Sequence, residues 1–271
     1  MLLAEPSRTQ FDLNFSIFGF PVRVHPLFWV MGLVLGFTGG GSDGIWIISC
    51  MLAVFVSILI HELGHALMIR RFGNEAHIVL YAMGGLAIEG RPRSGDPFGN
   101  PWESHTPDYG QRARTPGEQI LISAAGPGIQ LILAALIAGL VVATGGSIHA
   151  NFNGLIPLPV PELGGGLAKN ANLEDLVYVL LQINIFWALM NLLPVLPLDG
   201  GQIAMQLLTQ QDPWGGMQKT LWLSVITGGV MAVIGALVMQ EMFLMLLFGS
   251  LALSSFLTLQ QLGGGGGRRP W

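Results

Sequence analysis

The chain has 271 residues, of which 51% are hydrophobic and only 10% are charged, and its formal net charge is −4. An average soluble domain carries about 25% charged residues, so the composition excludes an ordinary soluble domain, and the weak negative charge gives no reason to expect a nucleic-acid partner. The single cysteine, Cys50, excludes an intrachain disulfide and a cysteine-rich metal site. Several apolar stretches approach or exceed the roughly 20 residues that cross a bilayer, which predicts a polytopic membrane protein.

The segments in chain order predict an all-α polytopic membrane protein of about six transmembrane helices with short membrane-associated β-hairpins. The hairpins are expected at 12–25 and 76–89, where aromatic and β-branched residues surround glycine. In the second hairpin Gly84-Gly85 predicts the turn, although a glycine-rich edge strand could also accept an extended substrate by β-augmentation. The six predicted spans cover residues 26–37, 45–69, 119–144, 173–193, 220–239 and 242–262.

Three polar segments are expected outside the spans. Residues 90–116 are rich in Pro, Gly and mixed charges, which predicts an exposed cytoplasmic loop with a composition typical of disorder. Residues 145–171 predict a second loop, and the glycine run within 263–271 predicts a flexible tail. We therefore expect one membrane-embedded domain, residues 1–262, followed by that tail.

The distribution of Lys and Arg predicts the orientation in the membrane. In a six-span arrangement 11 of the 12 basic residues lie on one side, and only Lys169 lies on the other. Basic residues mark the cytoplasmic side, so both termini are expected in the cytoplasm. The end of the second span and the segment after the fourth span are then expected on that same side. The basic side consists of residues 1–25, 70–116, 194–219 and 263–271.

The most specific motif is His61-Glu62-Leu63-Gly64-His65, near the end of the second predicted span. On a helix, residues four apart lie on one face, so both imidazoles can bind one Zn²⁺ while Glu62 handles a proton. Burying two histidines and a glutamate in an apolar helix without partners is costly, which favours metal binding over a structural role. The lone residues His25, His77 and His149 are expected to be hydrogen-bonded structural residues, although His25 and His77 could line the site entrance.

A third ligand is expected from Asp199, on the backbone that Pro194 and Pro197 interrupt after the fourth span. A carboxylate at this depth is costly and usually functional. The charge distribution also delivers it to the side on which the histidine motif lies. The alternative is a capping box, in which Asp199 and Gln202 begin the following helix without binding metal.

Three protein ligands with one open position are typical of catalytic zinc. Glu62 would take a proton from zinc-bound water and pass it to the leaving amine, which predicts peptide-bond hydrolysis. A non-catalytic zinc-binding membrane protein or transporter is the alternative, but it should place more acidic residues or histidines along the spans. A scaffold that has lost its activity is less favoured, because Glu62 and all three ligands are present.

In these residues and their spacing, the chain resembles the site-2 protease family of intramembrane zinc metalloproteases. The resemblance rests on the histidine motif and on the segment from Asn191 to Gly200, which matches the family pattern Asn-x-x-Pro-x-x-x-Leu-Asp-Gly. It implies that His61, His65 and Asp199 bind zinc, that Glu62 is the catalytic acid/base, and that Asn191 positions substrate or stabilises the oxyanion.

The resemblance also implies the substrates and the setting. Members of the family cut membrane-spanning segments of membrane-anchored regulators or remnant signal peptides, so the expected partners are a membrane-spanning protein and the lipid bilayer. We expect a multi-pass protein of a bacterial cell membrane. The segment 145–171 is too short for the PDZ domain of many relatives, and no CBS pair follows the last span, which predicts a minimal form of the family.

Overall fold

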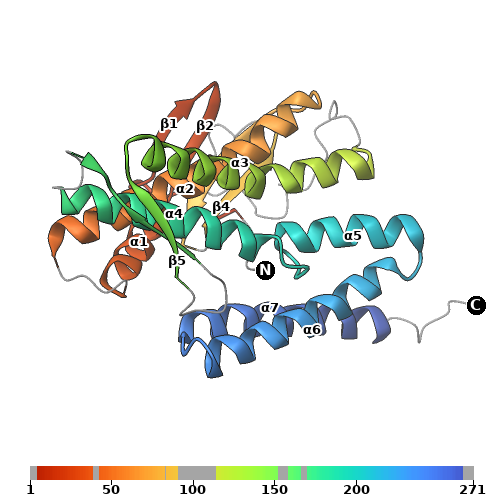
Figure 1. Cartoon of the computed structure of the whole chain (residues 1–271). Coiled ribbons are helices and arrows are strands. Elements are labelled where there is room, and N and C mark those ends of the chain that lie inside the picture. The colour runs from red at the N-terminus through yellow and green to blue at the C-terminus, as the bar shows by residue number, and fades with distance from the viewer. Residues whose placement is uncertain are drawn as a thin grey trace, which may run out of the picture. The chain divides into compact units, whose positions relative to one another are not determined.

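The computed structural model describes residues 5–38, 43–82, 84–90, 114–151, 158–165 and 170–264. Most of the predicted loop 90–116 and of the predicted tail 263–271 lies outside these residues. Seven helices and six strands follow one another in the described part of the chain (Figure 1). They are β1 (Leu13–Ile17), β2 (Phe20–Val24), α1 (Pro26–Thr38), α2 (Gly44–Arg71), β3 (Ala76–Tyr81), β4 (Gly84–Glu89), α3 (Pro116–Ala143), β5 (Ser147–Asn151), β6 (Leu158–Glu162), α4 (Ala171–Asn191), α5 (Asp199–Gln211), α6 (Gly216–Leu237) and α7 (Met242–Gly264).

The helices confirm the predicted class of fold. Among the described residues, α2, α3, α4, α6 and α7 are long and apolar enough to cross a membrane. Helix α1 has 13 residues. At 1.5 Å per residue it is about 20 Å long, less than the roughly 30 Å hydrocarbon core. The first of the six predicted spans, residues 26–37, is therefore a short apolar helix rather than a full-length one. The chain is a multi-pass membrane protein.

The four strands near the N-terminus form one sheet in the order β1-β2-β3-β4. Two antiparallel pairs, β1 with β2 and β3 with β4, confirm both predicted hairpins. Strands β2 and β3 pair in parallel, with Val22 opposite Ile78. The predicted turn is wrong in one detail: Gly84 and Gly85 are the first two residues of β4, opposite Tyr81 and Leu80.

A third antiparallel pair, β5 with β6, corrects the prediction that residues 145–171 are a loop. The prolines of β6, Pro159 and Pro161, favoured the loop prediction because proline cannot donate a ladder hydrogen bond. In a sheet of two strands every strand is an edge strand, and an edge tolerates proline.

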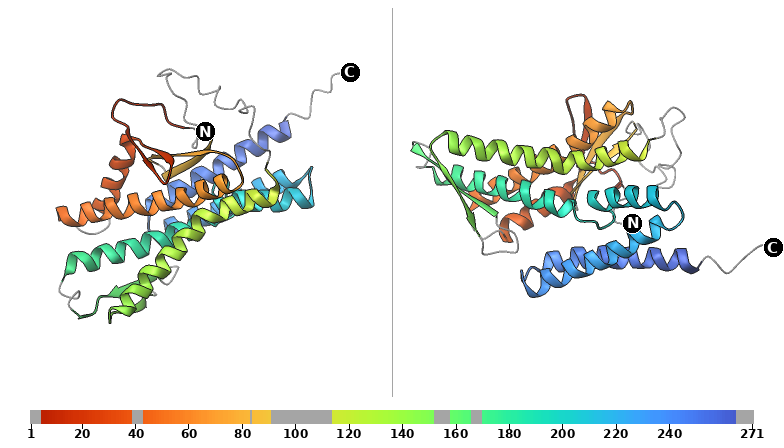
Figure 2. Two further views of the ribbon diagram at one scale, coloured as in Figure 1. Left: turned by 90° about the horizontal axis from the view of Figure 1, so that it is seen from above. Right: turned by 45° about the vertical axis from the view of Figure 1, so that its right-hand side comes forward.

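The described residues divide into two compact units. The first unit contains α1, α2, the four-stranded sheet, α3 from Ala125, the β5–β6 hairpin and α4 up to Ala188. The second unit contains the start of α3, the end of α4 and helices α5 to α7. In the second unit α6 and α7 lie side by side (Figures 1 and 2). A Cβ at Gly235 would come within 2.9 Å of the Met245 backbone nitrogen, so a small residue permits this close approach.

Helix α2 is the buried centre of the first unit, and half of its 28 residues are buried. It contacts α4 through a cluster of Cys50, Ala53 and Val179. It contacts α3 at Gly64, where an added Cβ would lie 2.6 Å from the Ala125 carbonyl oxygen. The His-Glu-x-x-His motif therefore lies at a close contact between α2 and α3, and this packing restricts the movement of its side chains.

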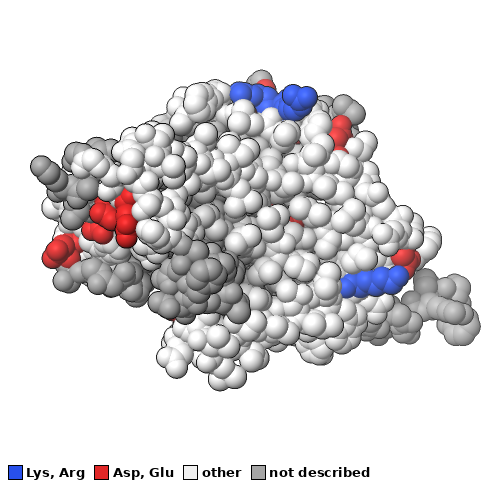
Figure 3. All heavy atoms as spheres, viewed as in Figure 1, with Lys and Arg blue, Asp and Glu red and all other residues white. Residues whose placement is uncertain are grey.

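The outward-facing surface of the helices is apolar. Leu136, Leu140, Ile226 and Leu237 expose more than half of their area. Figure 3 shows a face on which charged side chains are few and most of them lie toward its margins. Exposed aliphatic side chains on long helices are what a lipid environment requires, since hydrocarbon provides no hydrogen-bonding partner for charged groups.

The segment before β1 is attached to the sheet by an ion-pair cluster. The buried guanidinium of Arg23 lies 2.7 Å from Glu5 Oε1 and 3.0 Å from Asp12 Oδ2. His77 Nε2 lies 3.9 Å from Glu5 Oε2. His77, and after it Arg23, lower the pKa of the Glu5 carboxyl from its ordinary value of 4.5, against the opposing effect of burial.

Candidate metal centre

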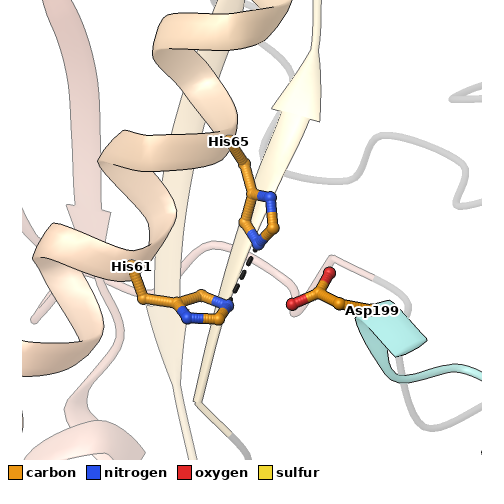
Figure 4. Close-up of side chains that lie close together, drawn as sticks. All are labelled: His61, His65 and Asp199. Carbon is orange, nitrogen blue, oxygen red and sulfur yellow. Dashed lines mark hydrogen bonds between the residues drawn. The ribbon is translucent and has the colours of Figure 1, made fainter. Parts of the chain in front are cut away.

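The two histidines of α2 point toward one another from successive turns of the helix (Figure 4). Their Nε2 atoms are 3.0 Å apart, and only 4% of His61 and 8% of His65 is exposed. Two nitrogens that bind one tetrahedral zinc at about 2.0–2.1 Å lie roughly 3.3 Å apart. The observed separation is close to that value, so the pair fits a single ion.

Asp199 is the third member of the group. One ligand atom from each of His61, His65 and Asp199 lies within 4.8 Å of the other two (Figure 4). Among the described residues, this is the one group of three or more His, Cys, Asp or Glu side chains that could hold a metal ion. Two imidazoles and one carboxylate form the ligand set of a catalytic zinc that keeps its fourth position open.

The capping alternative for Asp199 is not what the structure shows at the start of α5. The N-cap is Leu198, whose side chain has no hydrogen-bonding atom, and Asp199 is already the first helical residue. A carboxylate there is still favoured by the partial positive charge of the helix N-terminus. The N-cap position therefore does not explain why this residue is an aspartate.

Glycine at position 126 of α3 leaves the space that the imidazoles occupy. A Cβ on Gly126 would lie 2.3 Å from His65 Nε2 and 2.8 Å from His61 Nε2. Any other residue would therefore displace both candidate ligands. Gly128, two residues further along the same helix, has nothing within 4 Å of such an atom.

Glu62 is buried, with 5% exposure, and lies against the edge strand β4. A Cβ on Gly85 would lie 2.3 Å from Glu62 Cγ and 2.6 Å from Glu62 Oε1. Glycine therefore allows the strand to reach the carboxylate. The sequence prediction missed this contact, because the position of β4 against α2 depends on the tertiary fold and leaves no local signal.

The other predicted residues occupy distinct places. Asn191 is the last residue of α4 and is partly buried, and its role in binding substrate stays a prediction. The three lone histidines do make hydrogen bonds or ion pairs, as predicted. His25 Nδ1 accepts from the Leu27 N–H, His77 Nδ1 lies 2.9 Å from the Gly90 carbonyl oxygen, and His149 pairs with Glu162.

One further residue of the centre was missed from the sequence. Gln130 of α3 is fully buried, and its Oε1 lies 2.8 Å from His61 Nδ1. An amide in the middle of an apolar span is itself a signal, since burying it is costly unless it is hydrogen-bonded.

The sequence profile of peptidase family M50 matches residues 49–235. A zinc metalloprotease of Methanocaldococcus jannaschii is 25% identical over 251 residues, which are 92% of this chain and 56% of that protein. A Synechocystis protein whose name also contains the words zinc metalloprotease is 30% identical over 207 residues, which are 72% of this chain and 43% of that protein. The chain thus spans about half the length of the curated relatives it matches.

A solved structure has the same fold. The site-2 protease from Methanocaldococcus jannaschii superposes with a TM-score of 0.53 at 20% sequence identity. The match covers 92% of this chain and 95% of the solved chain. The short strands and the helices of this chain therefore share the fold of that solved protein.

Proposed function

We propose that this chain, which belongs to peptidase family M50, is a zinc metalloendopeptidase that cuts peptide bonds inside membrane-spanning segments. This is the site-2 protease family that the sequence motifs resemble. The observation that carries the proposal is the convergence of His61, His65 and Asp199 within 4.8 Å. The proposed ligands are these three side chains, and the proposed acid/base is Glu62.

The chemistry follows from the ligand set and its surroundings. Zinc held by these three side chains would lower the pKa of a coordinated water to about 7 and would polarise a carbonyl. Glu62 would accept a proton from the attacking water and deliver it to the leaving amine. Its carboxylate is buried between α2 and β4, on the helix that carries the two histidines. His61 and His65 would hold the metal in one place, because both are buried on the same helix.

The substrate must be unwound before it is cut, since a peptide carbonyl in a helix is already hydrogen-bonded. Strand β4 lies at the edge of its sheet, so it can pair with an extended substrate segment by β-augmentation. Gly85 on that strand lies against Glu62, which would bring the paired segment close to the acid/base. Asn191 is proposed to position the segment or to stabilise the oxyanion.

The setting is a bacterial cell membrane with both termini in the cytoplasm. The orientation of the termini is proposed with α1 counted as a sixth crossing, because 11 of the 12 basic residues then lie on one side of the membrane. Residues 1–262 then act as one protease domain that opens toward the cytoplasm, with 90–116 as a cytoplasmic loop. The proposed substrates are membrane-anchored regulators or remnant signal peptides, released toward the cytosol.

The test compares wild-type protein with Glu62→Ala, each reconstituted in vesicles with a model transmembrane substrate. The wild type is expected to carry one zinc per chain and to cleave. The variant is expected to keep its zinc and to lose cleavage, because Glu62 handles protons without binding metal. Equal cleavage by both proteins would refute the mechanism. Full zinc with no cleavage by the wild type on any transmembrane substrate would favour the alternative of a non-catalytic zinc-binding protein or transporter.

A further inference from the structure

Gln130 is a polar side chain buried at the contact between α3 and α2. It has no exposed area, although α3 is otherwise an apolar helix of membrane-spanning length. Burying an amide costs free energy unless both its oxygen and its nitrogen find partners. Both atoms have found partners here, and both partners belong to the helix that carries the histidine motif.

The contacts of Gln130 determine the direction of each hydrogen bond. Its Nε2 donates to the Ser57 carbonyl oxygen at 3.2 Å, an atom that can only accept. Gln130 Oε1 must then face His61 Nδ1, 2.8 Å away, and it accepts the proton that Nδ1 carries. Since neutral imidazole has one N–H, the lone pair of His61 lies on Nε2, the atom that faces His65.

Ser57, the second partner, is itself held in place. It lies four residues before His61 on the same helix, and its hydroxyl oxygen accepts from Asn184 Nδ2 of α4 at 2.9 Å. Ser57 and Asn184 have no exposed area. Gln130 therefore spans one turn of α2, from a fixed carbonyl to the ring of a candidate ligand.

We propose that Gln130 is a positioning residue for the metal, which holds the His61 ring in the Nδ1–H tautomer with Nε2 directed at the ion. The inference rests on the proposed function, because it assigns His61 the role of a zinc ligand. Hydrogen bonds of this kind from the second ring nitrogen orient metal-binding histidines and raise their basicity. A merely structural role would satisfy the buried amide but leave the tautomer and the metal affinity unchanged.

The first test is the zinc affinity of metal-free protein, measured by competition with a chromophoric chelator. Gln130→Met keeps the length and the apolar volume of the side chain but removes both hydrogen bonds. We expect it to bind zinc about 10–100-fold more weakly than the wild type. The matched control is Gln182→Met on α4, which loses a hydrogen bond to the Pro159 carbonyl oxygen and should bind zinc as the wild type does. Equal affinity of Gln130→Met and wild type would overturn the positioning role.

The second test reads the tautomer directly in the wild type, so it does not depend on the folding of Gln130→Met. ¹⁵N NMR of histidine-labelled, metal-free wild type should show His61 protonated at Nδ1, with its signal assigned by its absence in His61→Gln. A signal from His61 protonated at Nε2 would overturn the inference. Failure of the wild type to bind zinc would overturn the proposed function and the positioning role together. Normal zinc uptake by the wild type and by Gln130→Met alike would overturn the positioning role alone.

Discussion

Substitution of Gly126 by alanine tests whether the space beside the two imidazoles is required for zinc. The added Cβ would lie 2.3 Å from His65 Nε2, 2.6 Å from its Cε1 and 2.8 Å from His61 Nε2. Ordinary contact begins near 3.4 Å, so the ring of His65 must move by about 1 Å. Zinc–ligand distances tolerate only about 0.2 Å, and a shift of about 1 Å can cost roughly 100-fold in function.

We therefore expect Gly126→Ala to bind zinc roughly 100-fold more weakly than the wild type, with a parallel loss of cleavage. The assay is chelator competition on purified protein, together with cleavage of a transmembrane substrate in vesicles. The matched control is Gly128→Ala on the same helix, where the new methyl group meets open space. It should bind zinc normally, and alanine there favours the helix by up to about 1 kcal/mol. Wild-type zinc affinity in Gly126→Ala would refute the reasoning.

Three further predictions test the surroundings of the centre. Gly85→Ala should keep its zinc but cleave more slowly, because the added Cβ would displace Glu62, the proposed acid/base, and not a metal ligand. Loss of zinc from this variant in a metal assay would contradict the prediction. Ser224→Ala removes the acceptor of the Leu196 N–H, so the free energy of unfolding measured by thermal denaturation should fall by about 1–3 kcal/mol. The control Ser250→Ala, at an exposed site, should change that free energy little. Glu5→Gln should lower Tm at pH 7. Because the pKa of Glu5 is lowered in the folded protein, the difference in Tm from wild type should begin to shrink as pH falls through about 4.5 and should vanish only below the lowered pKa. A difference independent of pH would count against the ion-pair cluster.

The sequence was most informative where chemistry and periodicity coincide. Residues four apart on an apolar helix predicted the paired imidazoles, and the structure places their Nε2 atoms 3.0 Å apart. Asp199 was predicted from its costly position and from the distribution of basic residues, and its carboxylate lies with the histidines. Both predictions depend on strong free-energy terms, the burial of charge and the placement of Lys and Arg in a membrane.

The rest depends on tertiary contacts that local sequence does not encode. Gly126 and Gly85 differ from other glycines only in which side chains pack against them, and this is decided by how α3 and β4 approach α2. The β5–β6 hairpin was missed because Pro159 and Pro161 are typical of loops, yet a two-stranded sheet accepts them at its edges. The segment 91–113, predicted as a cytoplasmic loop, lies outside the described residues.

The central claim is that one zinc, held by His61, His65 and Asp199, allows Glu62 to direct the hydrolysis of a peptide bond in a membrane. The most direct measurement is a zinc titration of metal-free protein, reconstituted in vesicles with a transmembrane substrate and followed by the rate of cleavage. No cleavage is expected before zinc is added, and the rate should rise to a plateau at one zinc per chain, with Glu62→Ala remaining inactive throughout. Full cleavage by the metal-free protein, or a plateau that Asp199→Ala reaches at the same zinc concentration as the wild type, would contradict it.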